Sequence, residues 1–163
     1  MHLFSELGTD IFQTIFESVS EGIVVVNEQQ HIVSTNASAN EMFGYTAQEI
    51  VEQPLSMLIP REYHKEHTGH VNRFMDHGQK RSMGVGRDLY GQHKDGSRFP
   101  VEAGLSPFKI EGKSYVMALV IDISVRKKHQ QEILALNSQL EDKISKRTED
   151  LRQTVSELEA EVQ

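Results

Sequence analysis

Four histidines lie close together in "REYHKEHTGHVNRFMDHG", residues 61–78: His64, His67, His70 and His77. Imidazole nitrogens bind metal ions, and they also hydrogen-bond to carbonyl oxygens. At 100° per residue, a helix here carries an apolar stripe of Tyr63, Val71, Phe74 and Met75. His67 falls within that stripe, whereas the other three histidines lie toward its edges or on the polar side. We therefore expect His67 to face the core and the others to face solvent.

A zinc site on this helix is disfavoured by its geometry. His64, His67 and His70 are three residues apart, so neighbouring pairs could share a metal ion. Together the three span about 120° of the helix, which is too wide for one tetrahedral ion without an outside ligand. A buried imidazole also needs partners for its nitrogens. For His67, a backbone carbonyl and a metal ion both remain open.

Catalytic groups are not assembled in an enzyme-like pattern. Asp95, Glu102 and Asp122 could act as carboxylate catalysts, but no nucleophile accompanies a base and an orienting partner. Asp95 is better explained by the Asp-Gly turn in "KDGS". "GVGRDLYG" fits no phosphate-binding glycine pattern. We expect no catalysis by this chain, and we expect His93 and His129 to be solvated.

Composition excludes several classes of protein. The 163 residues suffice for one domain plus an extension, and 37% hydrophobic content indicates a non-globular part. A net charge of -7 argues against nucleic acid as a partner. The absence of cysteine excludes disulfides and thiol chemistry. There is no run of eighteen apolar residues and no secretory signal, so we expect no membrane segment and a cytoplasmic location.

The first 125 residues predict a mixed α and β domain. "LGTDIFQTIFESV" has the spacing of an amphipathic helix, and "EGIVVVNEQQHIVSTN" that of a β-hairpin. Asn36 is an N-cap for a helix closed by Gly44, and Thr46 with Glu49 forms a capping box. A helical turn lies between two prolines in 54–60, and the histidine helix follows over 61–77. Residues 81–124 hold three strands, with turns at "KDGS" and "IEGK".

The last forty residues predict a long helix with one apolar stripe. From 127 to 163 there is no glycine, proline or aromatic residue. Apolar residues fit an eleven-residue period, which favours straight or slightly right-handed packing: Ile133, Leu136, Leu140, Ile144, Leu151, Val155, Leu158 and Val162. Arg147 interrupts the stripe as a register element, a switch or a snorkelling side chain. The stripe favours pairing with a second copy over packing on its own domain.

The order of elements and the local motifs resemble the PAS sensor fold. The motifs are "EGIVVVNEQQHIVSTNASANEMFGYTAQEIVEQPLSMLIP", "GQHKDGSRFPVEAGLSPF" and "YVMALVIDISVRK". The resemblance implies an α+β fold in which a helical lid covers one face of a five-stranded antiparallel sheet. It also implies that ligands, where present, lie between lid and sheet, and that signals leave through the C-terminal helix. Asp122 at the strand end is implied to pair with Arg126 and steady that junction.

The stretch "HTGHVNRFMDHGQKRSMGVGR" is similar to the heme-binding PAS domains of oxygen-sensing histidine kinases, the FixL type. The resemblance implies His67 as axial ligand of heme b iron, with Arg73 and Arg81 near propionates. Arg87 is implied to switch between a propionate and bound oxygen. Ser82 and Met83 depart from the bulky aliphatics of that family's distal pocket. No ligand, an unknown ligand and heme all remain open as descriptions of this domain.

The C-terminal segment "LNSQLEDKISKRTEDLRQTVSELE" resembles linkers of sensor histidine kinases. We therefore expect an N-terminal extension over 1–8, a PAS sensory domain over 9–124, and a parallel dimeric coiled coil over 125–163. The expected function is that of a sensory and dimerisation module, which relays a change to a downstream output domain. Asp122, Ser124, Arg126 and Arg147 are the expected transmission residues. The alternative function is a heme-based gas or redox sensor that uses His67.

Overall fold

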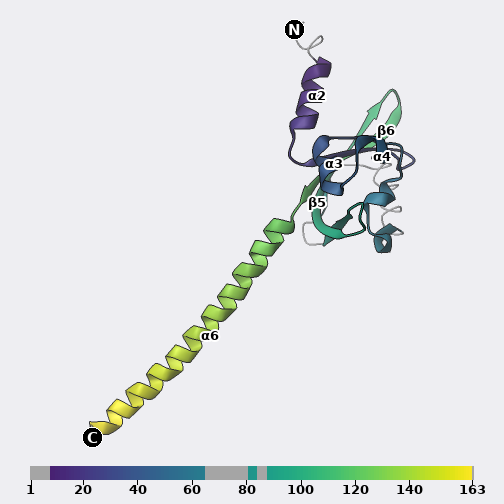
Figure 1. Cartoon of the computed structure of the whole chain (residues 1–163). Helices are drawn as coiled ribbons and strands as arrows, with labels where there is room; N and C mark the ends of the chain where they lie inside the picture. The colour runs from purple at the N-terminus through teal and green to yellow at the C-terminus, as the bar shows by residue number, and fades with distance from the viewer. Residues whose placement is uncertain (1–7, 65–80, 84–87, 163) are drawn as a thin grey trace. The chain divides into compact units, whose positions relative to one another are not determined.

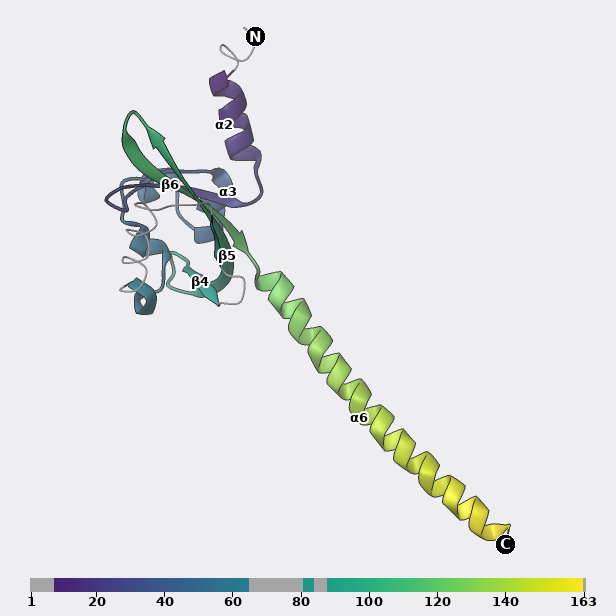
Figure 2. The ribbon, with the colours of Figure 1, turned by 180° about the vertical axis from the view of Figure 1, so that it is seen from behind.

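The computed structural model describes residues 8–64, 81–83 and 88–162. Its first helix, α2 (Gly8–Ser18), precedes the hairpin of β1 (Gly22–Asn27) and β2 (Ile32–Thr35). Short helices follow: α3 (Ala37–Phe43), α4 (Ala47–Ile50), η1 (Leu55–Leu58) and η2 (Arg61–Tyr63). The remaining elements are β3 (Arg81–Met83), β4 (Leu89–Gln92), β5 (Arg98–Ile110), β6 (Lys113–Asp122) and α6 (Ser124–Glu161). Figures 1 and 2 show them from opposite sides.

The strands form an antiparallel sheet in the order β2-β1-β6-β5-β3, and β4 also pairs with β5. Arg81 of β3 lies opposite Leu105, whereas Leu89 of β4 lies opposite Val101. Both short strands therefore occupy the same edge of β5, and the sheet is five strands wide, as predicted. Three strands were predicted after residue 80, whereas the described residues form four, because β3 and β4 are two short strands that pair with different parts of one edge of β5.

Local sequence signals for caps and turns are confirmed. The Asn36 side chain accepts a hydrogen bond from the Ala39 amide, and Gly44 ends α3 with a φ of 80°. Thr46 and Glu49 form the predicted capping box of α4. Gly96 has a φ of 86° in the turn between β4 and β5, where Asp95 accepts from the Ser97 amide at 2.8 Å. These contacts involve residues a few positions apart, so the sequence predicts them.

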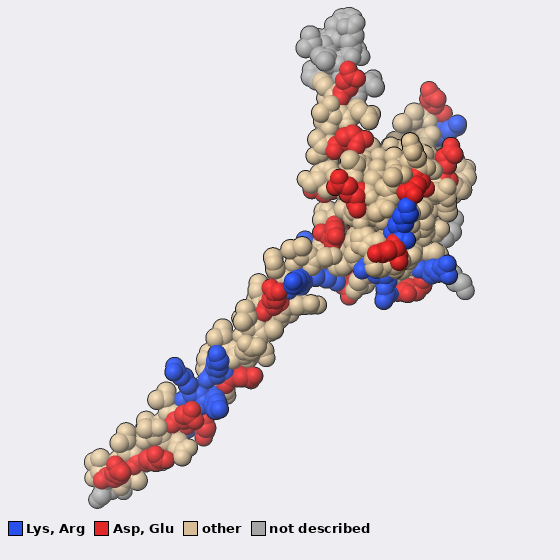
Figure 3. Space-filling model, in the orientation of Figure 1, with Lys and Arg blue, Asp and Glu red and all other residues tan. Residues whose placement is uncertain are grey.

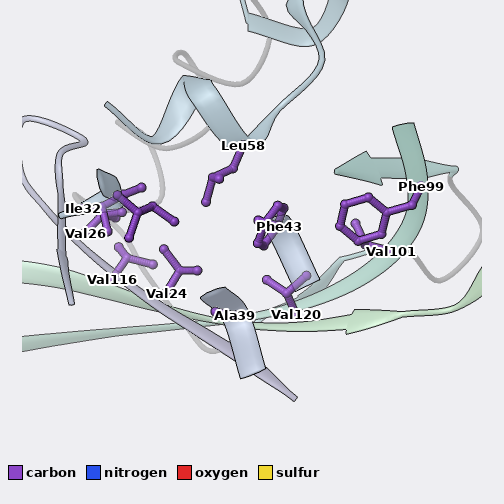
Figure 4. Packing of buried hydrophobic residues seen from close by; sticks show 11 residues of the cluster. Val24, Val26, Ile32, Ala39, Phe43, Leu58, Phe99, Val101, Val116 and Val120 are labelled. Carbon is purple, nitrogen blue, oxygen red and sulfur yellow. The ribbon is translucent and has the colours of Figure 1, made fainter. Parts of the chain in front are cut away.

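The hydrophobic core lies between the sheet and the short helices. Buried side chains from the inner face of the sheet pack with others from α3, α4 and η1: Val24, Val26, Ile32, Ala39, Phe43, Ile50, Leu58, Phe99, Val101, Val116 and Val120. Figure 4 shows Leu58 approaching this layer from the helical side, with Phe43 and Phe99 near one another. The Phe43 and Phe99 rings meet edge to face, with 5.3 Å between centroids. This packing fixes α3 against the β4–β5 hairpin.

The histidine helix is described only at its start. Residues 61–63 form the single 3₁₀ turn η2, and the rest of the predicted helix lies outside the described residues apart from His64. His64 is half-buried rather than on the surface, and its Nε2 lies 2.7 Å from the Ile59 carbonyl oxygen. The turn after Pro60 folds the ring back onto the preceding segment, which helical phase alone does not reveal.

His93 corrects a second prediction, since it is half-buried rather than solvated. Its ring stacks on Phe99 with 4.1 Å between centroids. The β4–β5 hairpin places the two residues on adjacent strands, because the His93 amide donates to the Ser97 carbonyl. Phe99 comes six residues after His93 and contacts its ring only because the hairpin brings them together, so the sequence alone did not reveal the contact.

The long helix α6 forms a unit of its own. Residues 1–124 and 125–163 are two separate compact units, and no residue of α6 is buried. In the view of Figure 3, basic side chains gather near its start and its middle, and acidic side chains are prominent toward its C-terminal end. Among the described residues, no helix is long and apolar enough to span a bilayer.

Candidate functional site

The start of α6 is attached directly to the central part of the sheet. Asp122 is the last residue of β6, and its Oδ1 accepts a hydrogen bond from the Ser124 amide at 2.8 Å. Ile123 between them is buried, and its amide donates to the Pro100 carbonyl at 3.0 Å. Two of the predicted transmission residues, Asp122 and Ser124, therefore meet where β6 becomes helix. The pairing of Asp122 with Arg126 remains a prediction.

The end of α2 is attached to the same part of the sheet through Asn36. Its Oδ1 accepts from the Ile23 amide at 2.8 Å and from the Ala39 amide at 2.9 Å. Its Nδ2 donates to the carbonyls of Phe16 and Glu21, at 3.0 Å each. The side chain is fully buried. A single amide thus joins the C-terminal end of α2 to β1 and α3.

Two further contacts complete this junction. Ser38 Oγ donates to the Val19 carbonyl at 2.6 Å, and Glu17 Oε2 accepts from the Ala37 amide at 2.8 Å. Sequence reasoning found Asn36 as a helix cap but missed its role in holding α2. The cap signal needs only the neighbouring amide, whereas the partners in 16–21 are brought close by the hairpin fold.

Both junctions lie at one end of the sheet. β1 follows α2 and β6 precedes α6, and these two strands are antiparallel neighbours with Gly22 opposite Val120. The first residue of β1 therefore lies beside the last residues of β6. The chain segments that lead to the two flanking helices therefore meet the sheet on neighbouring strands.

The β4–β5 hairpin is tied to the helical side by two ion pairs. Lys94 Nζ lies 2.6 Å from Glu49 Oε1 of α4, and Arg98 pairs with Glu62 of η2. Each cation also lies over an aromatic ring, Lys94 over Tyr45 and Arg98 over Tyr90. All four charged side chains are about half exposed, so each pair contributes little to global stability. Their effect is to fix the position of the hairpin.

Glu49 provides a pH-dependent test of this contact. The hydrogen bond from Lys94, followed by the backbone hydrogen bond of Thr46, lowers the pKa of Glu49 from 4.5 to about 2. Because the folded pKa is depressed, the stabilisation is complete above about pH 4.5 and is lost as the pH falls toward 2. We expect Glu49→Gln to lower the thermal unfolding midpoint at neutral pH, and the difference from wild type to shrink across this range.

Circular dichroism melts at a series of pH values measure this difference. Glu41→Gln, which changes an exposed carboxylate of α3, is the matched control and should leave the midpoint nearly unchanged. A Glu49→Gln difference that stays constant from neutral pH to about pH 2 would contradict the assignment.

A small cavity of about 310 Å³ lies at the opposite end of β1, where the two hairpins turn. It is lined by Asn27, Glu28, Gln29, Val33, Lys113, Ser114 and Tyr115. Glu28 accepts from the Ser114 amide at 2.8 Å, and this hydrogen bond lowers the pKa of Glu28. The carboxylate therefore links the hairpins and has a structural role.

Most of the predicted cofactor residues are outside the described part of the chain. His67, Arg73 and Arg87 lie in 65–80 and 84–87. Arg81 is placed in β3, opposite Leu105 on the edge of the sheet. Among the described residues, no cluster of three or more histidine or acidic side chains forms a metal site. Arg126 and Arg147 are exposed on α6.

The PAS domain family model matches residues 20–125, which include the whole sheet. The chain belongs to the PAS domain family. This confirms the predicted fold, and a crystal structure of a PAS domain from a two-component sensor histidine kinase supports it. That structure aligns with a TM-score of 0.60 and 13% identity, covering 72% of this chain and 98% of the other.

Curated relatives include sensor proteins that contain this kind of PAS domain. The oxygen sensor protein DosP of Escherichia coli is 34% identical over 115 residues, 71% of this chain and 14% of DosP. The sensor protein FixL of Bradyrhizobium diazoefficiens is 22% identical over 128 residues, 78% of this chain and 25% of FixL. The chain thus spans a quarter or less of the length of these relatives. The predicted resemblance to FixL-type PAS domains is confirmed.

Proposed function

We propose that this chain is the sensory and dimerisation module of a cytoplasmic signal transducer, with a sensor histidine kinase as the whole protein. Its PAS domain occupies residues 9–124, and residues 125–163 form a parallel coiled coil with a second copy. A change in the PAS core is relayed through the paired helices to a downstream output domain. The resemblance of the C-terminal segment to kinase linkers supports this assignment.

The observation that carries the proposal is the direct connection of β6 to α6. A single buried residue, Ile123, separates the strand from the helix, and Asp122 anchors the first helical amide. A shift of β6 is therefore transmitted to the start of α6 without an intervening flexible loop. Two helix packings that differ by a few kcal/mol suffice for a switch.

The exposed stripe of α6 supports pairing with a second copy. Its apolar side chains are all more than half exposed in the single chain, from Val155 at 52% to Val162 at 86%. Such a stripe requires a partner surface, and charged residues on both flanks are typical of a coiled-coil seam. Arg147 within the stripe weakens the seam locally and lowers the cost of a change in register.

The molar mass in solution tests this function. At micromolar concentration, we expect sedimentation equilibrium to give twice the mass of one chain, 18.5 kDa. A monomer under these conditions contradicts the proposed coiled coil.

A heme-based gas or redox sensor is the second candidate, favoured by the relationship to DosP and FixL. The core-facing side chains of the described sheet are aliphatic and aromatic, and the buried polar side chains of the described residues are Thr35 at the end of β2 and Asn36, the N-cap of α3. This lining fits a hydrophobic macrocycle. His67 would hold the iron, and Arg73, Arg81 and Arg87 would neutralise the propionates. Bound heme would supply the gas or redox chemistry, while the chain holds and orients it.

Reconstitution with hemin tests the heme candidate. We expect the purified protein to acquire an intense Soret band, and His67→Ala to lose it because the axial ligand is removed. His70→Ala, on the predicted solvent side, is the matched control and should retain the band. A spectrum unchanged in His67→Ala, or no band in the wild type, would contradict this function.

A further inference from the structure

Val125, at the first turn of α6, is 67% exposed although it is a large apolar residue. The residues between it and Ile133 are polar apart from their aliphatic stems: Arg126, Lys127, Lys128, His129, Gln130, Gln131 and Glu132. The apolar stripe considered so far begins at Ile133. Val125 therefore lies outside the stripe defined by Ile133 and the residues after it.

The eleven-residue spacing nevertheless assigns Val125 to the same face of the helix as the stripe. Val125, Leu136, Arg147 and Leu158 are spaced by eleven residues. His129, Leu140, Leu151 and Val162 form a second series with the same spacing. Eleven residues complete three helical turns, so the members of each series lie on nearly the same face. Val125 and His129 therefore extend the stripe back to the start of the helix.

We infer that the contact surface between two copies begins at Val125 and places the His129 side chains of both copies opposite each other. This inference rests on the coiled coil proposed above. It adds the residue at which the contact surface begins, Val125, and a polar layer formed by the two His129 side chains. In the single chain His129 is exposed, as predicted. In the pair it occupies a seam position, where side chains lose water.

Protonation of this layer opposes pairing. An imidazole ordinarily titrates near pH 6.5, and two protonated rings facing each other repel and lose hydration. The charged groups nearest the layer on each copy are Arg126 and Lys128 before His129 and Glu132 after it. Ammonium, guanidinium and carboxylate groups ordinarily keep their charge across the range in which an imidazole titrates, so the histidine pair determines the response to pH. The first turns of the helix pair, next to the PAS domain, are thus tightened at neutral pH and loosened in acid.

Disulfide formation tests the position of the seam, because the chain has no cysteine of its own. Under mild oxidation of the full chain, we expect His129→Cys to cross-link to dimer at least about tenfold faster than Gln131→Cys, which lies on the opposite side of the helix. Leu140→Cys tests the proposed coiled coil separately. Fast cross-linking at 140 with equally slow reaction at 129 and 131 overturns the inference and leaves the coiled coil standing. No cross-linking at 140 overturns both.

The pH dependence of the dimer tests the chemistry of the layer. Between about pH 7.5 and about pH 5.5, we expect the dissociation constant of the wild type to rise about tenfold or more. His129→Leu should bind more tightly and lose most of that change, whereas His93→Gln should retain it. The same pH dependence in His129→Leu and in the wild type overturns the inference, whatever the dimer affinity at neutral pH.

Discussion

Replacing Leu140 by lysine is expected to raise the dissociation constant of the dimer by about a hundredfold or more. Leu140 lies in the middle of the apolar stripe and is 55% exposed in the single chain. Pairing buries this side chain, and a lysine there would lose its hydration without gaining a counter-charge. Sedimentation equilibrium over a range of concentrations measures the change. At micromolar concentration the variant should be monomeric.

Leu134→Lys is the matched control for this substitution. Leu134 is 62% exposed on the same helix, but it lies about 100° away from Ile133, outside the stripe. The control should retain the dimer, since its lysine stays in water. Near-UV circular dichroism, which reports the aromatic side chains of the PAS domain, should be unchanged in both variants, because α6 contains no aromatic residue and forms a separate unit. Equal dissociation of both variants would show that the stripe is not the contact surface.

Replacing Asn36 by alanine is expected to destabilise the PAS domain by about 3 kcal/mol or more. The substitution removes the acceptor of two amides, those of Ile23 and Ala39, and the donor to two carbonyls, those of Phe16 and Glu21. Each buried polar group left without a partner costs about 1–3 kcal/mol. Urea unfolding followed by fluorescence or circular dichroism measures the loss.

Two further variants separate the roles of Asn36. Asn36→Asp keeps both acceptor contacts but loses the donor to Phe16 of α2 and the donor to Glu21. Hydrogen exchange should therefore become faster in α2 while α3 stays protected. Asn27→Ala is the control asparagine, because the Asn27 side chain accepts from the amides of Gln29 and His31 at an exposed turn. Asn27→Ala should lower the free energy of unfolding by about 1 kcal/mol. A loss in Asn36→Ala no larger than in Asn27→Ala would contradict the role of Asn36.

The local features of this fold are well predicted from the sequence, and the residues concerned show why. The cap at Asn36, the capping box of Thr46 and Glu49, and the Asp95 turn use partners within a few residues. The β-branched run of β1 and the long stripe on α6 likewise depend only on residues of the same element. The PAS family signature combines these local patterns, so the fold follows from them.

The sequence-based predictions were wrong or incomplete for contacts that form only when separate segments are brought together. His93 was predicted to be solvated, yet it stacks on Phe99 once the hairpin forms. The Asn36 side chain donates to the Phe16 carbonyl of α2 and to the Glu21 carbonyl just before β1. No periodicity encodes such partners, because they depend on how strands pair.

The sequence by itself determined most of the helical and strand segments, the caps of α3 and α4, and the single apolar stripe that α6 exposes. Those properties follow from backbone preferences and side-chain spacing within a segment. Only the tertiary structure decided that β1 and β6 lie side by side and that both flanking helices attach at one end of the sheet. The physical reason is that strand order results from burying one shared core, to which every element contributes side chains at once.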